Sequence, residues 1–155
     1  MLHLRSILYA DLEMIRHHRN RPDTNKWLEF QNHITENEQI KWYESGHANN
    51  FKILTSGNSD IGLARLCYMK ESCSVGCDLF EQFRGRGLAE SCFRHVMQEA
   101  LKFAKHLDLW VFKDNIPAYR TYTKCGFVID TITMPKLLFR QHSNNLHEYI
   151  RMVYK

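Results

Sequence analysis

Short blocks of apolar residues recur along this chain, and most of them are closed by residues that favour turns. A block of about 4–8 residues that is rich in β-branched or aromatic side chains is typical of a β-strand. Seven segments have this pattern: His3–Tyr9, Phe51–Thr55, Ile61–Met69, Ser72–Phe80, Leu107–Phe112, Phe127–Thr133 and His147–Tyr154. The segment Met134–Asn145 has no clear period, and we expect it to be a loop.

Four other segments have helical signals. Ala10–Arg19 should carry Leu12 and Ile15 inward, and Pro22 should end it because the residue before a proline disfavours helix. A second helix should begin at Thr35, which forms a capping-box pattern with Glu38. The other two are a helix from Leu88 to His106 with one apolar face and a helix that Asp114 or Asn115 caps and Gly126 ends.

This element order predicts an α+β fold, with a mixed, mostly antiparallel sheet of about seven strands and helices on both of its faces. Antiparallel strands come first, and a β-α-β crossover follows at residues 72–112. No repeat, linker or low-complexity segment divides the chain, so residues 1–155 are expected to form one domain.

The crossover contains a glycine-rich turn between its first strand and its helix. The turn and the helix start read Gln82-Phe83-Arg84-Gly85-Arg86-Gly87-Leu88-Ala89. Two glycines at alternate positions let backbone amides approach a ligand, and the helix start adds unpaired N–H groups. Such a turn favours an anion, usually a diphosphate, although it could also be only a tight connection between strand and helix.

Composition excludes several classes of function. The 155 residues are 44% apolar and 25% charged, and the net charge of +4 suits an anionic ligand without indicating nucleic acid. No apolar run is long enough to span a bilayer, and the expected compartment is the cytoplasm. The five cysteines lack a Cys-x-x-Cys pair and the nine histidines lack ligand spacing, so no metal site is expected and the thiols should be reduced.

Downstream, Asn115, Ala118 and Tyr122 fall on one face of the last helix, ahead of Gly126-Phe127. Combined with the glycine turn about thirty residues earlier, this pattern resembles the GNAT superfamily of acyl-CoA N-acyltransferases over essentially the whole chain. The resemblance implies acetyl-CoA as donor, bound in a V-shaped opening between the strands 72–80 and 107–112. It also implies that Tyr122 acts as the general acid, although this tyrosine could instead be a half-buried packing residue.

The resemblance also suggests which residues bind the coenzyme. Main-chain groups of Leu79 and Phe80 would pair with the pantetheine arm, and Asn115 would contact it further along. The complete set comprises Leu79, Phe80, Gln82, Phe83, Arg84, Gly85, Arg86, Gly87, Leu88, Ala89, Asn115, Ala118, Tyr122 and Lys124.

Acyl transfer from a thioester to an amine expels a thiolate, and free thiols have a pKa of about 8.5. A phenol with a pKa of about 10 stays protonated at neutral pH and can still give its proton to that thiolate. The attacking amine must be neutral, so a base has to take its proton. Asp78, Glu81 and His33 are the candidates, and none of them stands out.

The acceptor is less well defined. The stretch Arg19–Trp27, followed by His33-Ile34-Thr35, resembles the start of aminosugar and sugar-nucleotide N-acetyltransferases of the flagellin-modification type. An aminosugar acceptor is therefore the first expectation. The alternatives are a protein N-terminus, as in RimJ/RimL-like enzymes, another small amine, or a non-catalytic CoA-binding protein.

An arginine could meet a nucleotide phosphate in such an acceptor pocket, and an aromatic ring could stack on a base. Pocket candidates are Arg16, Arg19, Trp27, His33 and Trp42, while the tryptophans could equally be core anchors. The protein should be a monomer or a homodimer, with no nucleic-acid or membrane partner.

Overall fold

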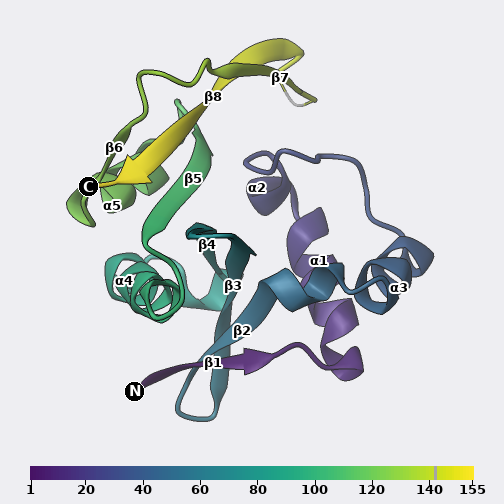
Figure 1. Cartoon of the computed structure of the whole chain (residues 1–155). Helices are drawn as coiled ribbons and strands as arrows, with labels where there is room; N and C mark the ends of the chain where they lie inside the picture. The colour runs from purple at the N-terminus through teal and green to yellow at the C-terminus, as the bar shows by residue number, and fades with distance from the viewer. Residues whose placement is uncertain (142) are drawn as a thin grey trace.

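A twisted mixed sheet runs through the molecule, as the computed structural model of residues 1–141 and 143–155 shows (Figure 1). Eight strands form it in the described part of the chain, in the order β1-β2-β3-β4-β5-β8-β6, with β7 pairing to β8. The strands are β1 (Leu2–Ser6), β2 (Phe51–Ser56), β3 (Ser59–Met69), β4 (Ser72–Leu79), β5 (His106–Phe112), β6 (Phe127–Ile129), β7 (Lys136–Arg140) and β8 (Asn145–Tyr154).

Helices cover both faces of this sheet, which confirms the predicted α+β class (Figure 1). On one side lie α1 (Leu12–Asn20), α2 (Pro22–Asn25) and α3 (Glu36–Glu44), and on the other α4 (Ala89–Leu101) and α5 (Ile116–Lys124). Short 3₁₀ turns at Tyr9–Asp11, His47–Asn50 and Glu81–Phe83 connect them. We call the side of α1–α3 the front face of the sheet and the side of α4 and α5 the back face.

The main core lies on the back face, where α4 packs on the sheet. Cys92, Val96 and Ala100 are fully buried, which confirms the apolar stripe predicted for this helix. The helix is shorter than predicted and ends at Leu101 instead of His106. The amides of Lys105 and His106 donate to the Glu71 carbonyl, at 2.7 and 3.1 Å, and so draw the chain into β5 before the helix can continue.

The N-terminal helices form a second core on the front face. Leu12 and Ile15 point inward as predicted, at 5% and 0% exposure. The capping box also forms, because Thr35 Oγ1 accepts from the Glu38 amide at 3.2 Å and a Glu38 carboxylate oxygen accepts from the Thr35 amide at 2.8 Å. Arg21 is extended ahead of Pro22, as expected, but the chain then forms the extra short helix α2.

Strands β4 and β5 are parallel and stay together for only a short distance. Ser72–Ser74 pairs with His106–Asp108, and no further pair joins the two strands within the described residues. From there β5 pairs with β8, while β4 keeps its pairing with β3 up to Leu79. The strands therefore separate after Ser74, as predicted, and we call the place where they part the strand split.

The segment Met134–Asn145 was predicted to be a loop, and this prediction is wrong for its central part. Lys136–Arg140 forms β7, antiparallel to β8, while His142 lies outside the described residues. The run Lys-Leu-Leu-Phe-Arg does not alternate apolar and polar residues, so its strand state depends on pairing with β8. The preceding strand is also shorter than predicted and stops at Ile129, because Asp130 turns the chain by accepting from the Ile132 amide at 3.0 Å.

Candidate active site

The glycine turn leaves β4 at its C-terminal end and leads into α4. Gly85 and Gly87 have φ values of +72° and +73°, a region that L-amino acids rarely adopt, so the turn requires glycine at both positions. A Cβ atom at either glycine would meet nothing within 4 Å. The turn is therefore open to solvent on its glycine side, and a ligand there can reach the backbone directly.

The two arginines of this turn have different surroundings. Arg84 folds back: its Nε donates to the Leu79 carbonyl at 2.9 Å, and its Nη2 donates to Thr24 Oγ1 at 2.8 Å. Its guanidinium also pairs with Asp23 at 3.1 Å, so Arg84 ties the turn to α2. Arg86 is exposed over the Phe83 ring, 5.4 Å from its centroid, and is the cation of the turn that is open to a diphosphate.

The strand end next to the turn uses several of its own main-chain groups. The Phe80 amide donates to the Ile61 carbonyl at 2.9 Å, and the Phe80 carbonyl accepts from the Phe83 amide at 2.9 Å. The Leu79 carbonyl accepts from Arg84. The Phe80 amide, expected to pair with pantetheine, is thus held inside the protein, and a ligand would have to rely on the other main-chain groups near the split.

Helix α5 places Tyr122 beside the split from the back face. Its ring packs on Phe93, with centroids 4.8 Å apart, and on Phe127 at 6.4 Å. Burial raises the pKa of Tyr122 well above its usual value, and the nearby Cys77 and Asp78 raise it further. The phenol is therefore protonated throughout the neutral pH range, and within the described residues its hydroxyl has no hydrogen-bond partner.

The other predicted residues of α5 take up the expected face. Asn115 stands at the N-cap position without a side-chain cap bond, which leaves its amide available to a ligand. Asn115 and Ala118 are half-buried like Tyr122, whereas Lys124 is exposed at the far end and contributes its carbonyl to Arg94 at 2.8 Å.

Asp78 reaches the opposite face of the split, at the edge of β4. It points to the front face, because its register partner Leu63 packs in the core of α1. His18 Nε2 lies 2.6 Å from Asp78 Oδ2, and Arg84 Nη2 lies 3.4 Å from the other carboxylate oxygen. The carboxylate is 44% exposed, so it keeps a side open to solvent although His18 and Arg84 both contact it.

Sequence reasoning missed His18. This side chain is 4% exposed and packs edge-on against Phe80, with ring centroids 4.9 Å apart. Only its position one turn after Ile15, on the inward face of α1, could have indicated that it is buried. The other two candidate bases are less well placed, because Glu81 pairs with Arg21 at 2.8 Å and His33 is exposed in the segment between α2 and α3.

The residues predicted to line the acceptor pocket do not form one cluster. Two cationic groups already lie over the ring of Trp27: Arg140 Cζ is 4.8 Å and Lys26 Nζ is 4.9 Å from the ring centroid. Arg16 pairs with Glu13 on the surface of α1.

Trp42 packs on Phe51 with Arg19 over its ring, at centroid distances of 5.4 and 5.8 Å respectively. Neither Trp27 nor Trp42 is therefore a bare platform on which a base could stack.

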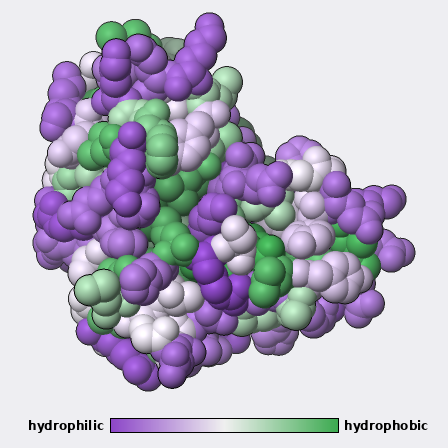
Figure 2. Space-filling view, turned by 60° about the horizontal axis from the view of Figure 1, so that its bottom comes forward, coloured by the Kyte–Doolittle hydropathy of each residue, from purple (hydrophilic) through white to green (hydrophobic). Residues whose placement is uncertain are grey.

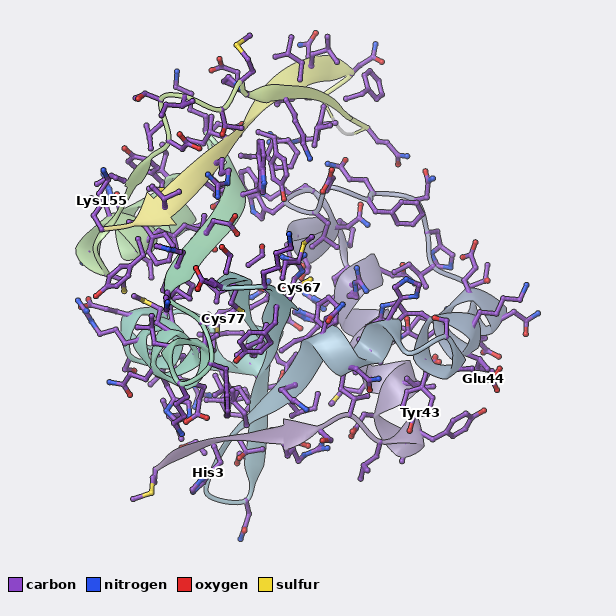
Figure 3. The ribbon with its side chains drawn as sticks, in the orientation of Figure 1. His3, Tyr43, Glu44, Cys67, Cys77 and Lys155 are labelled. Carbon is purple, nitrogen blue, oxygen red and sulfur yellow. The ribbon has the colours of Figure 1, made fainter. Side chains whose placement is uncertain are left out.

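The front and back faces of the sheet carry different side chains beside the strand split. Figure 3 labels Cys67 on β3 toward α1 and α2, and Cys77 on β4 toward α4. Burial raises the pKa of the Cys77 thiol well above its usual range, so this residue is a neutral apolar neighbour of Tyr122. A space-filling view shows apolar side chains gathered in the middle of one face of the molecule, bordered by polar ones (Figure 2).

All five cysteines are free. Within residues 1–141 and 143–155, no group of three or more His, Cys, Asp or Glu side chains is placed to hold a metal ion. None of the described helices is long and apolar enough to cross a membrane.

Comparisons with known proteins agree with this geometry. The model of the acetyltransferase (GNAT) domain family matches residues 1–128. No curated protein matches the chain by sequence.

Solved structures match over nearly the whole chain. Spermidine N-acetyltransferase from Vibrio cholerae, solved with CoA and spermine, superposes with a TM-score of 0.86 at 20% identity, over 98% of this chain and 94% of that one. An N-acetyltransferase from Staphylococcus aureus Mu50 gives 0.79 at 16% identity, covering 100% and 98%. Ribosomal-protein-alanine N-acetyltransferase from Brucella melitensis gives 0.75 at 15% identity, covering 97% and 98%.

Proposed function

This chain belongs to the acetyltransferase (GNAT) family and is an N-acetyltransferase with acetyl-CoA as its donor, and we propose that it acetylates a small primary amine by direct attack across the strand split. One observation carries this proposal: Tyr122 and Asp78 flank the split from opposite faces of the sheet. A protonated phenol and an open carboxylate are the acid and the base that amine acetylation needs.

The coenzyme would enter from the glycine turn. Its diphosphate would lie against the amides around Gly85 and Gly87, with the charge of Arg86 beside it. Its pantetheine arm would then follow the split between β4 and β5, where unpaired strand edges offer main-chain groups. Asn115 and Ala118 on α5 would line the same path and bring the thioester to Tyr122.

The acceptor nitrogen would approach from the front face. Asp78 takes the proton from the ammonium form, the neutral nitrogen attacks the thioester carbonyl carbon, and a tetrahedral intermediate forms. When this intermediate collapses, the carbon–sulfur bond breaks and Tyr122 gives its proton to the departing thiolate. The nitrogen then loses its second proton, which restores the Tyr122 phenol, and the proton on Asp78 is released to solvent. His18 is a positioning residue in this scheme, because it holds the Asp78 carboxylate from behind at 2.6 Å without facing the split.

A small amine fits better than the aminosugar nucleotide that the N-terminal sequence suggested. Two of the three structural neighbours are named for their acceptors, spermidine and a ribosomal-protein alanine, and neither acceptor is an aminosugar. Base stacking also lacks a platform, since Trp27 and Trp42 are already covered. Lys136 Nζ lies 4.4 Å from the third indole ring, that of Trp110, and Tyr149 stacks on the same ring.

A turnover screen tests this proposal. Acetyl-CoA would be incubated with the protein and with members of four acceptor classes: diamines and amino acids, hexosamines, UDP-linked hexosamines and N-terminal peptides. Free thiol would report turnover, and mass spectrometry would identify the acetylated product. We expect the highest kcat/KM with a small amine. Higher kcat/KM for the UDP-linked sugars or for the peptides would contradict the proposed acceptor class.

A further inference from the structure

Two arginines of the front face lack the ion pair that most other arginines of this protein have. Salt bridges are formed by Arg5, Arg16, Arg21, Arg84, Arg94, Arg140 and Arg151. Arg86 and Arg120 are exposed, where water satisfies a guanidinium. Only Arg19 and Arg65 are both shielded from solvent and without a carboxylate partner among the described residues.

The sheet register places these two residues together. Arg65 on β3 pairs with Phe51 on β2, and Arg19 Cζ lies 5.8 Å from the Phe51 ring. On its other side Arg65 pairs with Gly76 on β4, which lies just beyond the last residue that pairs with β5. Residues paired in antiparallel strands point to the same face, so both guanidinium groups lie on the front face beside the strand split.

Arg19 is half-buried against two aromatic rings. Burial among Trp42 and Phe51 lowers its pKa, whereas the carboxylate of Asp78 opposes this change. No hydrogen bond of its guanidinium to another described residue is present, although the side chain carries five donors. Arg19 is half-buried by exposed area, so water satisfies its guanidinium only in part, and a bound anion would supply the missing partner.

Arg65 lies close to both edges of the split. Its Nη1 donates to Ser74 Oγ at 2.7 Å, at the last β4 residue that pairs with β5. Burial raises the pKa of Tyr149, which comes from β8 on the far side of the split, and the nearby charge of Arg65 opposes this rise. The remaining guanidinium donors of Arg65 are therefore available at the place where an acceptor would approach the thioester.

Apart from Asp78, the proposed base, the carboxylates around this region are already in ion pairs. Asp23 pairs with Arg21 and Arg84, Glu81 pairs with Arg21, and Glu29 pairs with Lys136 at 3.4 Å. A polycationic acceptor would find no unpaired carboxylate among these three. The local balance of unpaired charge is positive, which favours an acceptor that brings a negative group.

We propose that Arg19 and Arg65 form a subsite for an anionic group of the acceptor, so that the substrate is an amine that also carries a carboxylate or a phosphate. The inference rests on the proposed acetylation of a small amine and narrows its substrate class. It separates this chain from an enzyme for polyamines, which carry no anion. Both guanidinium groups would donate charge-assisted hydrogen bonds to the anion while its amine faces Asp78.

Matched acceptor pairs test the subsite. Lysine and cadaverine differ only in a carboxylate, and glucosamine 6-phosphate and glucosamine differ only in a phosphate, so the two pairs also distinguish the two anions. For the wild-type protein, kcat/KM should be about 10-fold or more higher for the anionic member of at least one pair. This comparison needs no variant and so does not depend on how a substitution folds.

Variants then assign the effect to the two arginines. Arg19→Gln and Arg65→Gln should each raise KM for the preferred anionic acceptor about 10- to 100-fold, while KM for the matched acceptor that lacks the anion changes little. Arg19→Lys keeps the charge and should retain part of the preference. The control Arg120→Gln removes an exposed arginine of α5 that has no ion pair to another described residue. It should leave KM unchanged for both members of the acceptor pair.

The outcomes separate the subsite from the proposed function. Turnover with equal or higher kcat/KM for cadaverine and glucosamine would overturn the anion subsite and leave amine acetylation standing. An anion preference that survives both glutamine variants would overturn the assignment to Arg19 and Arg65. Absence of turnover with every acceptor would contradict the proposed function and the subsite together.

Discussion

Gly87→Ala tests the coenzyme site with little other disturbance. The residue has a φ of +73°, and a Cβ atom there meets no protein atom within 4 Å. The substitution therefore adds no steric clash within the protein. Its cost comes from the left-handed backbone alone, about 1–2 kcal/mol for a residue other than glycine. For a domain of this size that corresponds to a fall in Tm of roughly 2–8 °C.

Gly87→Ala should also weaken binding of the coenzyme, independently of its effect on stability. The turn has to keep its amides aimed at the diphosphate, and a Cβ atom on its open side stands where the ligand approaches. Loss of a single hydrogen bond to a charged group costs about 1.5–3 kcal/mol, which corresponds to a Kd for CoA about 10- to 150-fold higher. Isothermal titration calorimetry with CoA measures this Kd directly, and urea unfolding measures the stability of the same sample.

Gly57→Ala is the matched control. Gly57 lies in the β2–β3 hairpin with a φ of +59°, and a Cβ atom there also meets nothing within 4 Å. Its loss of stability should match that of Gly87→Ala, while its Kd for CoA should equal that of the wild type. If the two variants bind CoA equally well, the glycine turn does not bind the diphosphate and the site has been assigned to the wrong loop.

Three further substitutions have definite expected results. Asp78→Asn should lower kcat/KM about 10²–10⁴-fold at pH 7, and part of the loss should disappear as pH rises toward the pKa of the acceptor amine; a flat pH profile would exclude Asp78 as the base. Thr35→Ala removes the α3 cap and should cost about 1 kcal/mol in urea unfolding, and no change would show that the capping box is dispensable. The Arg5 guanidinium lowers the pKa of Asp11 in the folded protein. The stability difference between wild type and Asp11→Asn should therefore be largest above the unfolded pKa of 3.8 and should shrink as pH falls below it. A difference that does not change with pH would contradict this ion pair.

Local patterns predicted the elements whose residues carry their own signals. The capping box of Thr35 and the break at Pro22 both follow from backbone chemistry within a few residues. The apolar stripe of α4 is of the same kind, since its period alone indicates which side is buried. These features were confirmed.

Features that depend on residues far apart in the sequence were missed or were predicted incorrectly. Strand β7 exists because it pairs with β8, and Arg140 at its end reaches Asp114 at 2.7 Å and Trp27 at 4.8 Å. His18 reaches Asp78 only after sixty residues of intervening chain have folded. The same limit applies to Arg84, whose guanidinium is turned toward α2 by Thr24, a contact that no local pattern could indicate.

The role of Tyr122 is the central claim about mechanism, and a single-turnover measurement tests it most directly. Wild type, Tyr122→Phe and the control Tyr119→Phe would each be loaded with acetyl-CoA, mixed with the acceptor found by the screen, and followed by release of free thiol. Tyr119 is also half-buried on α5 and packs against the same core, so its variant controls for loss of a phenol hydroxyl elsewhere on this helix. Tyr122→Phe keeps the ring packing on Phe93 and removes only the proton donor.

We expect Tyr122→Phe to lower the single-turnover rate by about 10²-fold or more with an unchanged Kd for acetyl-CoA, while Tyr119→Phe keeps the wild-type rate. A wild-type rate in Tyr122→Phe would contradict the proposed mechanism, because the thiolate would then be protonated from another source and Tyr122 would be a packing residue.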